Sequence, residues 1–276
     1  MVSSQNTGSS PTAFRAVLSR AVVTGCMLFV MCILTGFPCV SADAQEFTDG
    51  EKDPFDYAWE VQFREKTIGY SLSRFCSVDE GDEERLCADG YRSFDFEIGP
   101  VSLRVTEQTR VVWDDRGYMR ELEARTAVGG STTMTHAKRT TDGVSIVKKT
   151  DRKQKEYFFA GSEYDHTEAD RFLHTLSDPG EKETLRILSI TEEKVKSISY
   201  EALGITDFLV AGKNLACFRV GFKGPKSTGE MLVDALGIPV FFDMDTPLGP
   251  FTFVPCDPDV AMDVLFSEEA DFFDIP

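Results

Sequence analysis

Apolar and polar residues alternate through most of the chain after residue 56, and this pattern predicts β-strands. Trp59, Val61 and Phe63 fall on one face of the first such segment, with charged or polar side chains between them. The same alternation returns in five later segments: Phe94–Ile98, Leu103–Val105, Val144–Ile146, Tyr157–Phe159 and Phe218–Phe222. A two-residue period is typical of half-buried strands, so we expect a sheet with one face toward a core.

Turn sequences such as Asp89-Gly90 and Asp142-Gly143 separate these segments, and no long helical pattern intervenes. Two stretches favour short helices: Thr167–Leu176, and a segment that begins at Asp257 with Pro258 in its first turn. The pattern therefore predicts a mainly β protein. We expect a curved antiparallel sheet or an incomplete β-barrel with one or two short helices.

One hairpin pattern occurs twice, because residues 110–134 align without a gap with residues 230–254. Each copy has an apolar strand, an Asp-x-x-Gly turn and a second apolar strand, and a fixed period is what repeated architectures leave in a sequence. The alternative is shared hairpin chemistry, since both turns need a residue with positive φ. We favour a true structural repeat.

The repeat suggests how the chain is organised. We expect a single antiparallel β-domain over residues 45–256, built from two related halves at about 46–177 and 178–256. No linker rich in Gly, Ser or Pro separates the halves. Residues 257–276 form an acidic C-terminal tail that contains the second expected helix.

Residues 1–44 have the three parts of a secretory signal peptide. A polar start with Arg15 and Arg20 precedes the apolar run Ala21–Val40, and the small-residue site Ala42-Asp43-Ala44 follows. We predict cleavage after Ala44 and a periplasmic or secreted protein. The run is long enough to span a bilayer, so a retained anchor is the alternative. We expect no stable transmembrane anchor after cleavage.

Four cysteines remain after the signal: Cys76, Cys87, Cys217 and Cys256. Proximity in sequence favours disulfides between Cys76 and Cys87 and between Cys217 and Cys256, although four cysteines allow three pairings. Zinc is the competing interpretation. Because no Cys-x-x-Cys spacing occurs and export leads to an oxidising compartment, we predict disulfides.

The charge of the chain limits its partners. The net charge is −17, and phosphate binding needs clustered cations, so we expect no nucleic acid partner. One basic stretch, residues 148–155, falls where the pattern predicts a hairpin tip. We expect a solvated tip that discourages edge pairing, and contact with anionic lipid is the alternative.

Candidate chemistry is sparse. His166, Glu168, Asp170 and His174 form the one cluster with metal-like residue types, and zinc would need at least three convergent ligands. The cluster also fits a charged segment beside a helix, which is the interpretation we favour. The sequence has no Gly-x-Ser-x-Gly motif for nucleophilic catalysis. We therefore expect no enzyme activity and no metal or other cofactor, with a metal-dependent enzyme as the least favoured alternative.

Several short phrases accompany the expected hairpins: Ile68-Gly69-Tyr70, Trp113-Asp114-x-x-Gly117, Val210-x-Gly212-Lys213 with Cys217-x-Arg219-Val220, and Val233-Asp234-x-x-Gly237-Ile238-Pro239. These phrases resemble those of bacterial secreted domains of unknown function. That group is similar in turn to β-domains beside periplasmic transglutaminase-like modules, and at fold level to the lipoprotein-localisation (Lol) carriers. The resemblance covers about residues 57–256 and implies an exported, incomplete antiparallel barrel around an apolar interior.

Aromatic residues occupy both faces of several expected strands, and such a sheet must cover each face with something. We therefore predict an exported, non-catalytic binding protein whose apolar concave face accepts a lipid-like ligand. The alternative is a periplasmic protein-interaction or envelope-assembly module that docks an envelope protein through sheet edges and the acidic tail. The expected ligand-lining residues are Trp59, Phe63, Trp113, Phe218, Val220 and Phe222.

Overall fold

The computed structural model describes residues 57–80, 83–98, 101–171, 176, 178–210, 213–235, 237–268 and 272–273. The expected signal peptide, residues 1–44, lies outside these residues, and so does His174. In the part of the chain that is described, no helix is long and apolar enough to cross a membrane. The strands are β1 (Tyr57–Phe63), β2 (Lys66–Glu80), β3 (Glu83–Ile98), β4 (Val101–Trp113), β5 (Met119–Val128), β6 (Ser131–Arg139), β7 (Gly143–Thr150), β8 (Lys153–Ala160), β9 (His166–Thr167), β10 (Lys182–Ser189), β11 (Lys194–Val210), β12 (Lys213–Lys223), β13 (Thr228–Val233), β14 (Pro239–Thr246) and β15 (Gly249–Pro255).

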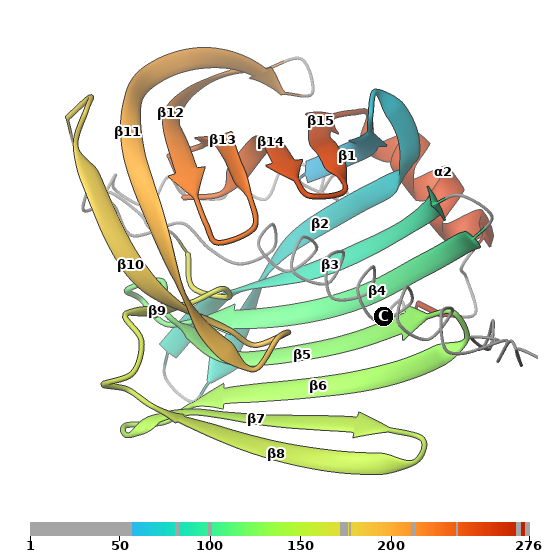
Figure 1. Ribbon diagram of the computed structural model, residues 1–276, viewed down its shortest axis with the longest axis vertical. Coiled ribbons are helices and arrows are strands. Elements are labelled where there is room, and N and C mark those ends of the chain that lie inside the picture. The colour runs from blue at the N-terminus through green and yellow to red at the C-terminus, as the bar shows by residue number, and fades with distance from the viewer. Residues whose placement is uncertain are drawn as a thin grey trace, which may run out of the picture.

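These strands form one strongly curved sheet that does not close into a barrel (Figure 1). Their order is β8-β7-β6-β5-β4-β3-β2-β1-β15-β14-β13-β12-β11-β10-β9. Neighbours in the chain pair antiparallel, and the first strand pairs with β15, with Trp59 opposite Pro255. Only the short β9 pairs in parallel, with β10. The predicted fold class is confirmed.

The repeated hairpin is present in three dimensions, in the β4–β5 and β13–β14 turns. In each turn the first aspartate accepts the backbone N–H of the residue four positions later at 2.8 Å, through Oδ1 of Asp114 and of Asp234. Gly117 and Gly237 have φ angles of 80° and 79°, which glycine adopts without strain. The strand register also shifts immediately before both turns. The two copies therefore share a conformation as well as a sequence pattern.

The tail covers one face of the sheet. Helix α2 (Pro258–Glu268) begins where the sequence predicted, and Asp257 caps it by accepting the N–H of Asp259 at 2.9 Å. The helix lies against β1, β2 and β3 on the side opposite the concave face (Figure 1). The rings of Phe266 and Phe273 pack against the ring of Tyr91 on β3, with centroid distances of 5.6 and 5.5 Å. The aromatic residues of the tail thus pack on the protein's own sheet.

The helix predicted over Thr167–Leu176 is wrong at its start. His166 and Thr167 form β9, residues 168–170 form a turn, and residues 172–175 and 177 lie outside the described part of the chain. A tertiary contact overrides the local preference here, because the backbone N–H of Glu168 donates to the carbonyl of Leu188 at 2.9 Å. The segment therefore joins the edge of the sheet.

One of the two predicted disulfides is present. Cys76 and Cys87 are bonded and lie directly opposite each other on β2 and β3. The pairing of Cys217 with Cys256 is wrong, since both are free thiols. Cys217 lies on β12 and Cys256 follows β15, so three strand spacings, about 14 Å, separate them across the sheet. A disulfide needs Cα atoms within about 7 Å.

The two edge strands of the sheet are β8 and β9. We call residues 161–171 the connector: it leaves the end of β8, includes β9 and continues through the turn that follows, and its backbone docks on the β4–β5 hairpin. The indole of Trp113 donates to the carbonyl of Ala169 at 2.7 Å, and the N–H of Arg171 donates to the carbonyl of Gly117 at 2.8 Å. The connector thus holds the two edges together where no strand pairing does.

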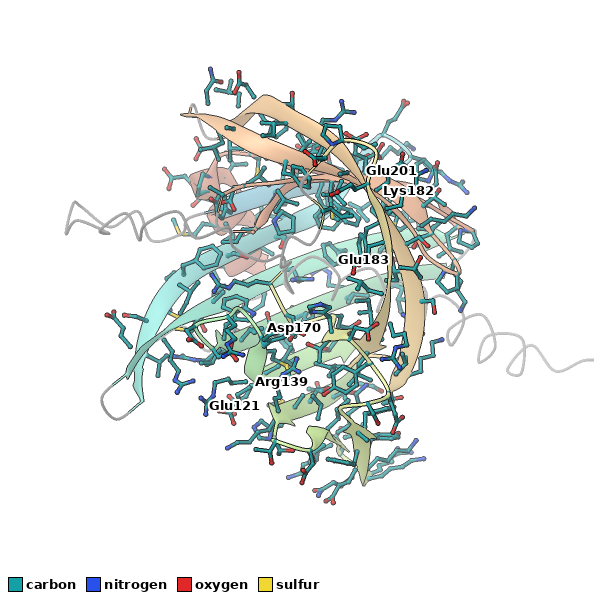
Figure 2. The ribbon with its side chains drawn as sticks, turned by 90° about the vertical axis from the view of Figure 1, so that its left-hand side faces the viewer. Glu121, Arg139, Asp170, Lys182, Glu183 and Glu201 are labelled. Atoms are coloured by element: carbon teal, nitrogen blue, oxygen red, sulfur yellow. A yellow bond between two sulfur atoms is a disulfide. The ribbon has the colours of Figure 1, made fainter. Side chains whose placement is uncertain are left out.

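Asp170 is the anchor of the connector, and its side chain is 1% exposed. Its carboxylate accepts a charged hydrogen bond from Arg139 at 2.6 Å and the backbone N–H groups of Met119 and Thr167, each at 2.8 Å (Figure 2). Burial by itself would raise the pKa of Asp170. The nearby imidazole of His166, the charge of Arg139 and the two backbone donors outweigh burial and lower that pKa below its ordinary value.

A second polar contact lies further along the same edges. Residues 148–155 form the predicted tip of the β7–β8 hairpin, and residues 149–156 are exposed. Lys148, however, is only 14% exposed, donates to the carbonyl of Thr191 at 2.6 Å and pairs with Glu193 in the β10–β11 turn. The tip is therefore solvated over residues 149–156, as expected, while Lys148 at its base links it to the opposite edge.

The cysteine assignment predicts the outcome of peptide mapping. Alkylation in denaturant without reductant should label the Cys217 and Cys256 peptides and leave the Cys76 and Cys87 peptides linked. In the native protein both thiols should react slowly at pH 8, because burial raises the pKa of Cys217 and of Cys256 to about 11. A linked Cys217–Cys256 peptide would contradict the structure.

Asp170→Asn should lower the free energy of unfolding by about 3 kcal/mol, because it leaves the charge of Arg139 without its buried partner. The matched control is Asp165→Asn, which breaks the exposed pair with Arg186 in the same connector and should cost less than about 1 kcal/mol. Urea denaturation measures both values. Equal losses in the two variants would show that the buried anchor has no special role.

Candidate functional site

The concave face of the sheet carries a large apolar cluster with contributions from both walls of the curve. Phe94 of β3 meets Phe253 of β15 with ring centroids 6.4 Å apart, although three strand spacings separate them along the sheet. Curvature therefore brings the walls together. The concave cluster comprises Trp59, Val61, Phe94, Phe96, Val105, Leu176, Ala202, Val220, Met231, Val233, Phe242, Met244, Phe251 and Phe253.

Five of the six predicted ligand-lining residues lie in or against the concave cluster. Trp59 and Val220 are buried within it, and Phe63, Phe218 and Phe222 are partly buried and pack against it. Their rings are held by neighbours: Phe63 lies 4.7 Å from the centroid of one phenylalanine and Phe222 lies 5.1 Å from that of another. The partly buried rings form the solvent-facing border of the cluster.

Apolar surface continues outward from this border along β11. Ile205 is 76% exposed and lies directly opposite Phe218 on the neighbouring strand, so the two side chains share a face. Leu209, four residues further along β11, is 62% exposed. The concave cluster is therefore continuous with apolar side chains that water contacts.

Trp113, the sixth predicted residue, belongs to a different group. It lies in the edge cluster, which packs β4–β7 against the connector and β10. Its indole hydrogen bond to Ala169 fixes the connector, so the structure gives Trp113 a part in closing the edges. The edge cluster comprises Ala88, Val111, Trp113, Met119, Leu122, Ala124, Ala137, Val144, Ile146, Tyr164, Ala169, Leu188 and Ile190.

A band of buried polar side chains lies between the two clusters on the same face. Along β3 the inward positions run from Ala88 in the edge cluster, through Arg92, to Phe94 in the concave cluster. Along β4 Glu107 and Thr109 fall between Val105 and Val111 in the same way. We call this band the polar belt. Its members, each at most 6% exposed, are Ser71, Arg92, Glu107, Thr109 and Thr126.

The centre of the polar belt is an ion pair between Arg92 and Glu107, which lie opposite each other on β3 and β4. Their Nη1 and Oε2 atoms are 3.5 Å apart, and Thr126 donates to Oε1 of Glu107 at 3.1 Å. Burial lowers the pKa of Arg92 and raises that of Glu107, and the opposite charge of each partner only partly offsets burial. Such a pair costs desolvation energy that its own geometry does not fully return.

A third buried carboxylate faces this region from the connector. Burial raises the pKa of Glu168. Hydrogen bonds from the N–H and hydroxyl of Thr191, at 2.7 and 2.9 Å, and the charge of Lys196 act in the opposite direction but are outweighed. The charge of Glu168 also raises the pKa of Glu107. The connector therefore brings a second acidic group toward the polar belt.

The metal-like cluster of the sequence is not assembled as a metal site. His166 and Asp170 approach to 3.6 Å, but Asp170 is bound to Arg139 and Glu168 is turned to Thr191. His174 is outside the described residues. Among the residues that are described, no group of three or more His, Cys, Asp or Glu side chains is placed to hold a metal ion.

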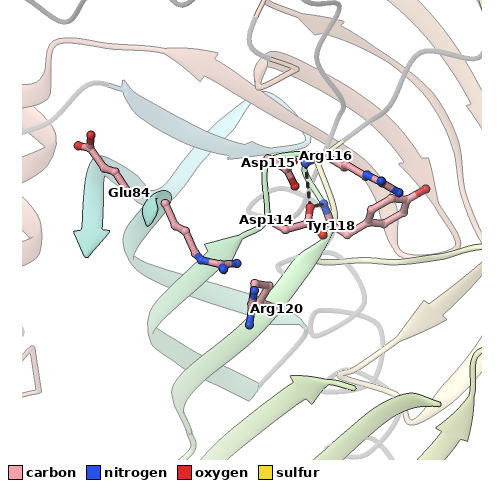
Figure 3. Close-up of a pocket in the computed structure, with 7 residues that line it drawn as sticks. Glu84, Asp114, Asp115, Arg116, Tyr118 and Arg120 are labelled. Atoms are coloured by element: carbon pink, nitrogen blue, oxygen red, sulfur yellow. Dashed lines mark hydrogen bonds between the residues drawn. The ribbon is translucent and has the colours of Figure 1, made fainter. Parts of the chain in front are cut away.

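A recess lies at the β4–β5 turn and has a volume of about 660 Å³ (Figure 3). Asp114 is one of its walls, and its Oδ1 already accepts the N–H groups of Arg116 and Tyr118. Three guanidinium groups and three carboxylates line the recess, so it has no clear preference for an anion or a cation. The lining residues are Glu84, Arg85, Asp114, Asp115, Arg116, Tyr118 and Arg120.

No protein-family model matches the sequence, and no curated protein does. Among solved structures, the fold is similar to a β-barrel-like protein of the DUF1849 domain of unknown function from Brucella abortus. The TM-score is 0.52 at 10% identity, over 73% of this chain and 94% of that one. A DUF1089 family protein from Pseudomonas aeruginosa has a TM-score of 0.36 at 14% identity, over 62% of this chain and 88% of that one. The likeness to the first shows a shared β-barrel-like fold.

Sequence reasoning did not single out the polar belt, although a signal for it exists. Arg92 falls two positions before Phe94, and Glu107 two positions after Val105, so the alternation that predicts inward phenylalanine and valine also predicts inward charges. A charged residue in phase with core positions is buried at a cost unless it is paired and hydrogen-bonded.

Glu168→Gln should flatten the dependence of stability on pH. The raised pKa of Glu168 means that the folded state holds a proton that the unfolded state releases, so wild-type stability falls as pH rises above the ordinary value of 4.5. Glutamine cannot titrate and can still accept from Thr191. Urea denaturation should show that the free energy of unfolding falls less between pH 5 and pH 8 in the variant than in the wild type. An equal fall in both proteins would contradict the raised pKa.

Proposed function

We propose that this protein is an exported, non-catalytic binding protein that holds an apolar, lipid-like ligand on its concave face. The observation that carries the proposal is the concave cluster, which extends without interruption from fully buried rings to partly exposed Phe63, Phe218 and Phe222 and then to Ile205. Contiguous apolar surface that water can reach is typical of ligand or partner sites.

The energetic argument favours an apolar ligand. Each square ångström of apolar surface removed from water contributes roughly 25 cal/mol, so shielding the exposed side chains of Ile205 and Leu209 and the rings at the border gives a useful binding energy. The walls are linked by one continuous sheet and by the connector, so little ordering is needed on binding. A preformed, apolar, concave surface suits a hydrocarbon chain.

Export is part of the proposal. Its support is the signal-like segment of residues 1–44 and the disulfide between Cys76 and Cys87, since disulfides persist in oxidising compartments. A periplasmic location would also agree with the resemblance to secreted domains and Lol carriers. Lys148 is engaged by Glu193, which leaves the rest of the 148–155 tip available to solvent or membrane.

The alternative, partner docking through the acidic tail, has less support. The rings of Phe266 and Phe273 contact Tyr91, and Arg125 stacks over the ring of Phe272 with 4.5 Å between the guanidinium carbon and the centroid. These side chains stabilise the protein's own sheet. The concave face is therefore the better candidate for binding.

Fluorescence of N-phenyl-1-naphthylamine, which increases in apolar surroundings, tests the proposal. Wild-type protein should bind this probe, and Phe222→Ala should weaken binding by about tenfold because it removes one ring from the border of the cluster. The control is Phe158→Ala on β8, a ring that is 57% exposed and outside the concave cluster, which should leave binding unchanged. Absence of binding, or equal loss in both variants, would refute the proposal.

A further inference from the structure

The polar belt has hydrogen-bonding capacity that the described protein does not use. Oγ of Ser71 and Oγ1 of Thr109 are buried and have no hydrogen-bond partner. Oε2 of Glu107 is also buried and accepts no hydrogen bond, and its contact is the 3.5 Å ion pair with Nη1 of Arg92. A buried oxygen that accepts or donates no hydrogen bond destabilises the fold. Two unpartnered hydroxyls beside a carboxylate oxygen with unused acceptor capacity exceed what a purely structural belt explains.

These atoms share one surface. Ser71 is opposite Arg92, and Arg92 is opposite Glu107, so the three positions form one row across β2, β3 and β4. Thr109 lies two residues from Glu107 and therefore on the same face. Arg92 also lies two residues, about 7 Å, from Phe94 of the concave cluster. The unused polar atoms thus adjoin the apolar surface of the proposed site.

We infer that the ligand of the concave face is an uncharged amphiphile with a hydroxyl-bearing head group, whose head lies on the polar belt and whose chain lies on the concave cluster. This inference rests on the proposed function and specifies its ligand class. Head-group hydroxyls donate to Oε2 of Glu107 and exchange hydrogen bonds with Ser71 and Thr109. A monoacylglycerol has this chemistry.

An anionic head group fits the belt less well. Glu107 lies in the centre of the belt, and Glu168 lies near enough to raise the pKa of Glu107. A carboxylate or phosphate would meet two acidic side chains there, and Arg92 is already paired with one of them. Hydroxyl donors, by contrast, complement both carboxylates without adding charge to a buried site.

Three probes with the same acyl chain separate the head-group chemistries: 1-monolauroylglycerol, methyl laurate and laurate, each below its micellar concentration. Their displacement of N-phenyl-1-naphthylamine gives three affinities. The glycerol ester should bind at least about tenfold more tightly than the other two, because a hydrogen bond to a charged group contributes about 1.5–3 kcal/mol. Methyl laurate reports on the apolar surface alone.

The double variant Ser71→Ala, Thr109→Val should reduce the preference for the glycerol ester over methyl laurate to below about threefold. Methyl laurate binding should not change, which also shows that the variant is folded. Ser93→Ala is the matched control, since Ser93 is adjacent to Arg92 in the strand and so lies on the opposite face, 3.5 Å from Thr106. This control should keep the full preference.

The outcomes distinguish this inference from the proposed function. Equal binding of all three probes, or tightest binding of laurate, overturns the hydroxyl head group and leaves the apolar site standing. Loss of the preference in Ser93→Ala as well would assign it to general destabilisation and overturn the role of the belt. If neither the three probes nor the naphthylamine dye binds, both this inference and the proposed function fail.

Discussion

The shape of this protein depends on how the two edges of one long sheet are held together. Backbone pairing between strands ends at β8 and β9, and the contacts of the connector hold these two edges together. Asp170 is its anchor, because a single buried carboxylate is bound at once to Arg139 and to the N–H groups of Met119 and Thr167. A buried carboxylate with that many donors is satisfied in only one geometry. It therefore fixes the position of the connector on the sheet more strongly than apolar packing would.

Closing the edges has consequences for the interior. The concave face becomes a surface with three zones along the strands: the edge cluster, the polar belt and the concave cluster. The last of these continues to exposed apolar side chains such as Ile205. The Arg92–Glu107 pair is costly where it stands, and a hydrophobic pair of similar volume would stabilise the fold as well or better. Stability of the fold therefore does not by itself account for this pair.

The alternation of apolar and polar residues was sufficient to predict the sheet, the repeated hairpin and most of the apolar lining, because burial of one strand face follows directly from a two-residue period. It failed where the outcome depends on contacts between strands. Proximity in sequence favours pairing Cys217 with Cys256, but three strand spacings separate them in the sheet. The segment at Thr167 joins the sheet because the N–H of Glu168 donates to the carbonyl of Leu188. The polar belt is visible in the pattern because Arg92 is in phase with Phe94, but it forms no sequence motif.

The pairing of β1 with β15 constrains how the molecule can assemble. Trp59 meets Pro255, so the central ladder of the sheet joins the first and last strands and spans almost the whole domain in sequence. Contacts between such distant segments require large loop closures, and domains rich in them fold slowly. A chain that emerges from its N-terminus would hold β1 and the rings of the concave cluster exposed until the last strand arrives. Exposed apolar surface during that delay makes the unfinished chain prone to aggregation.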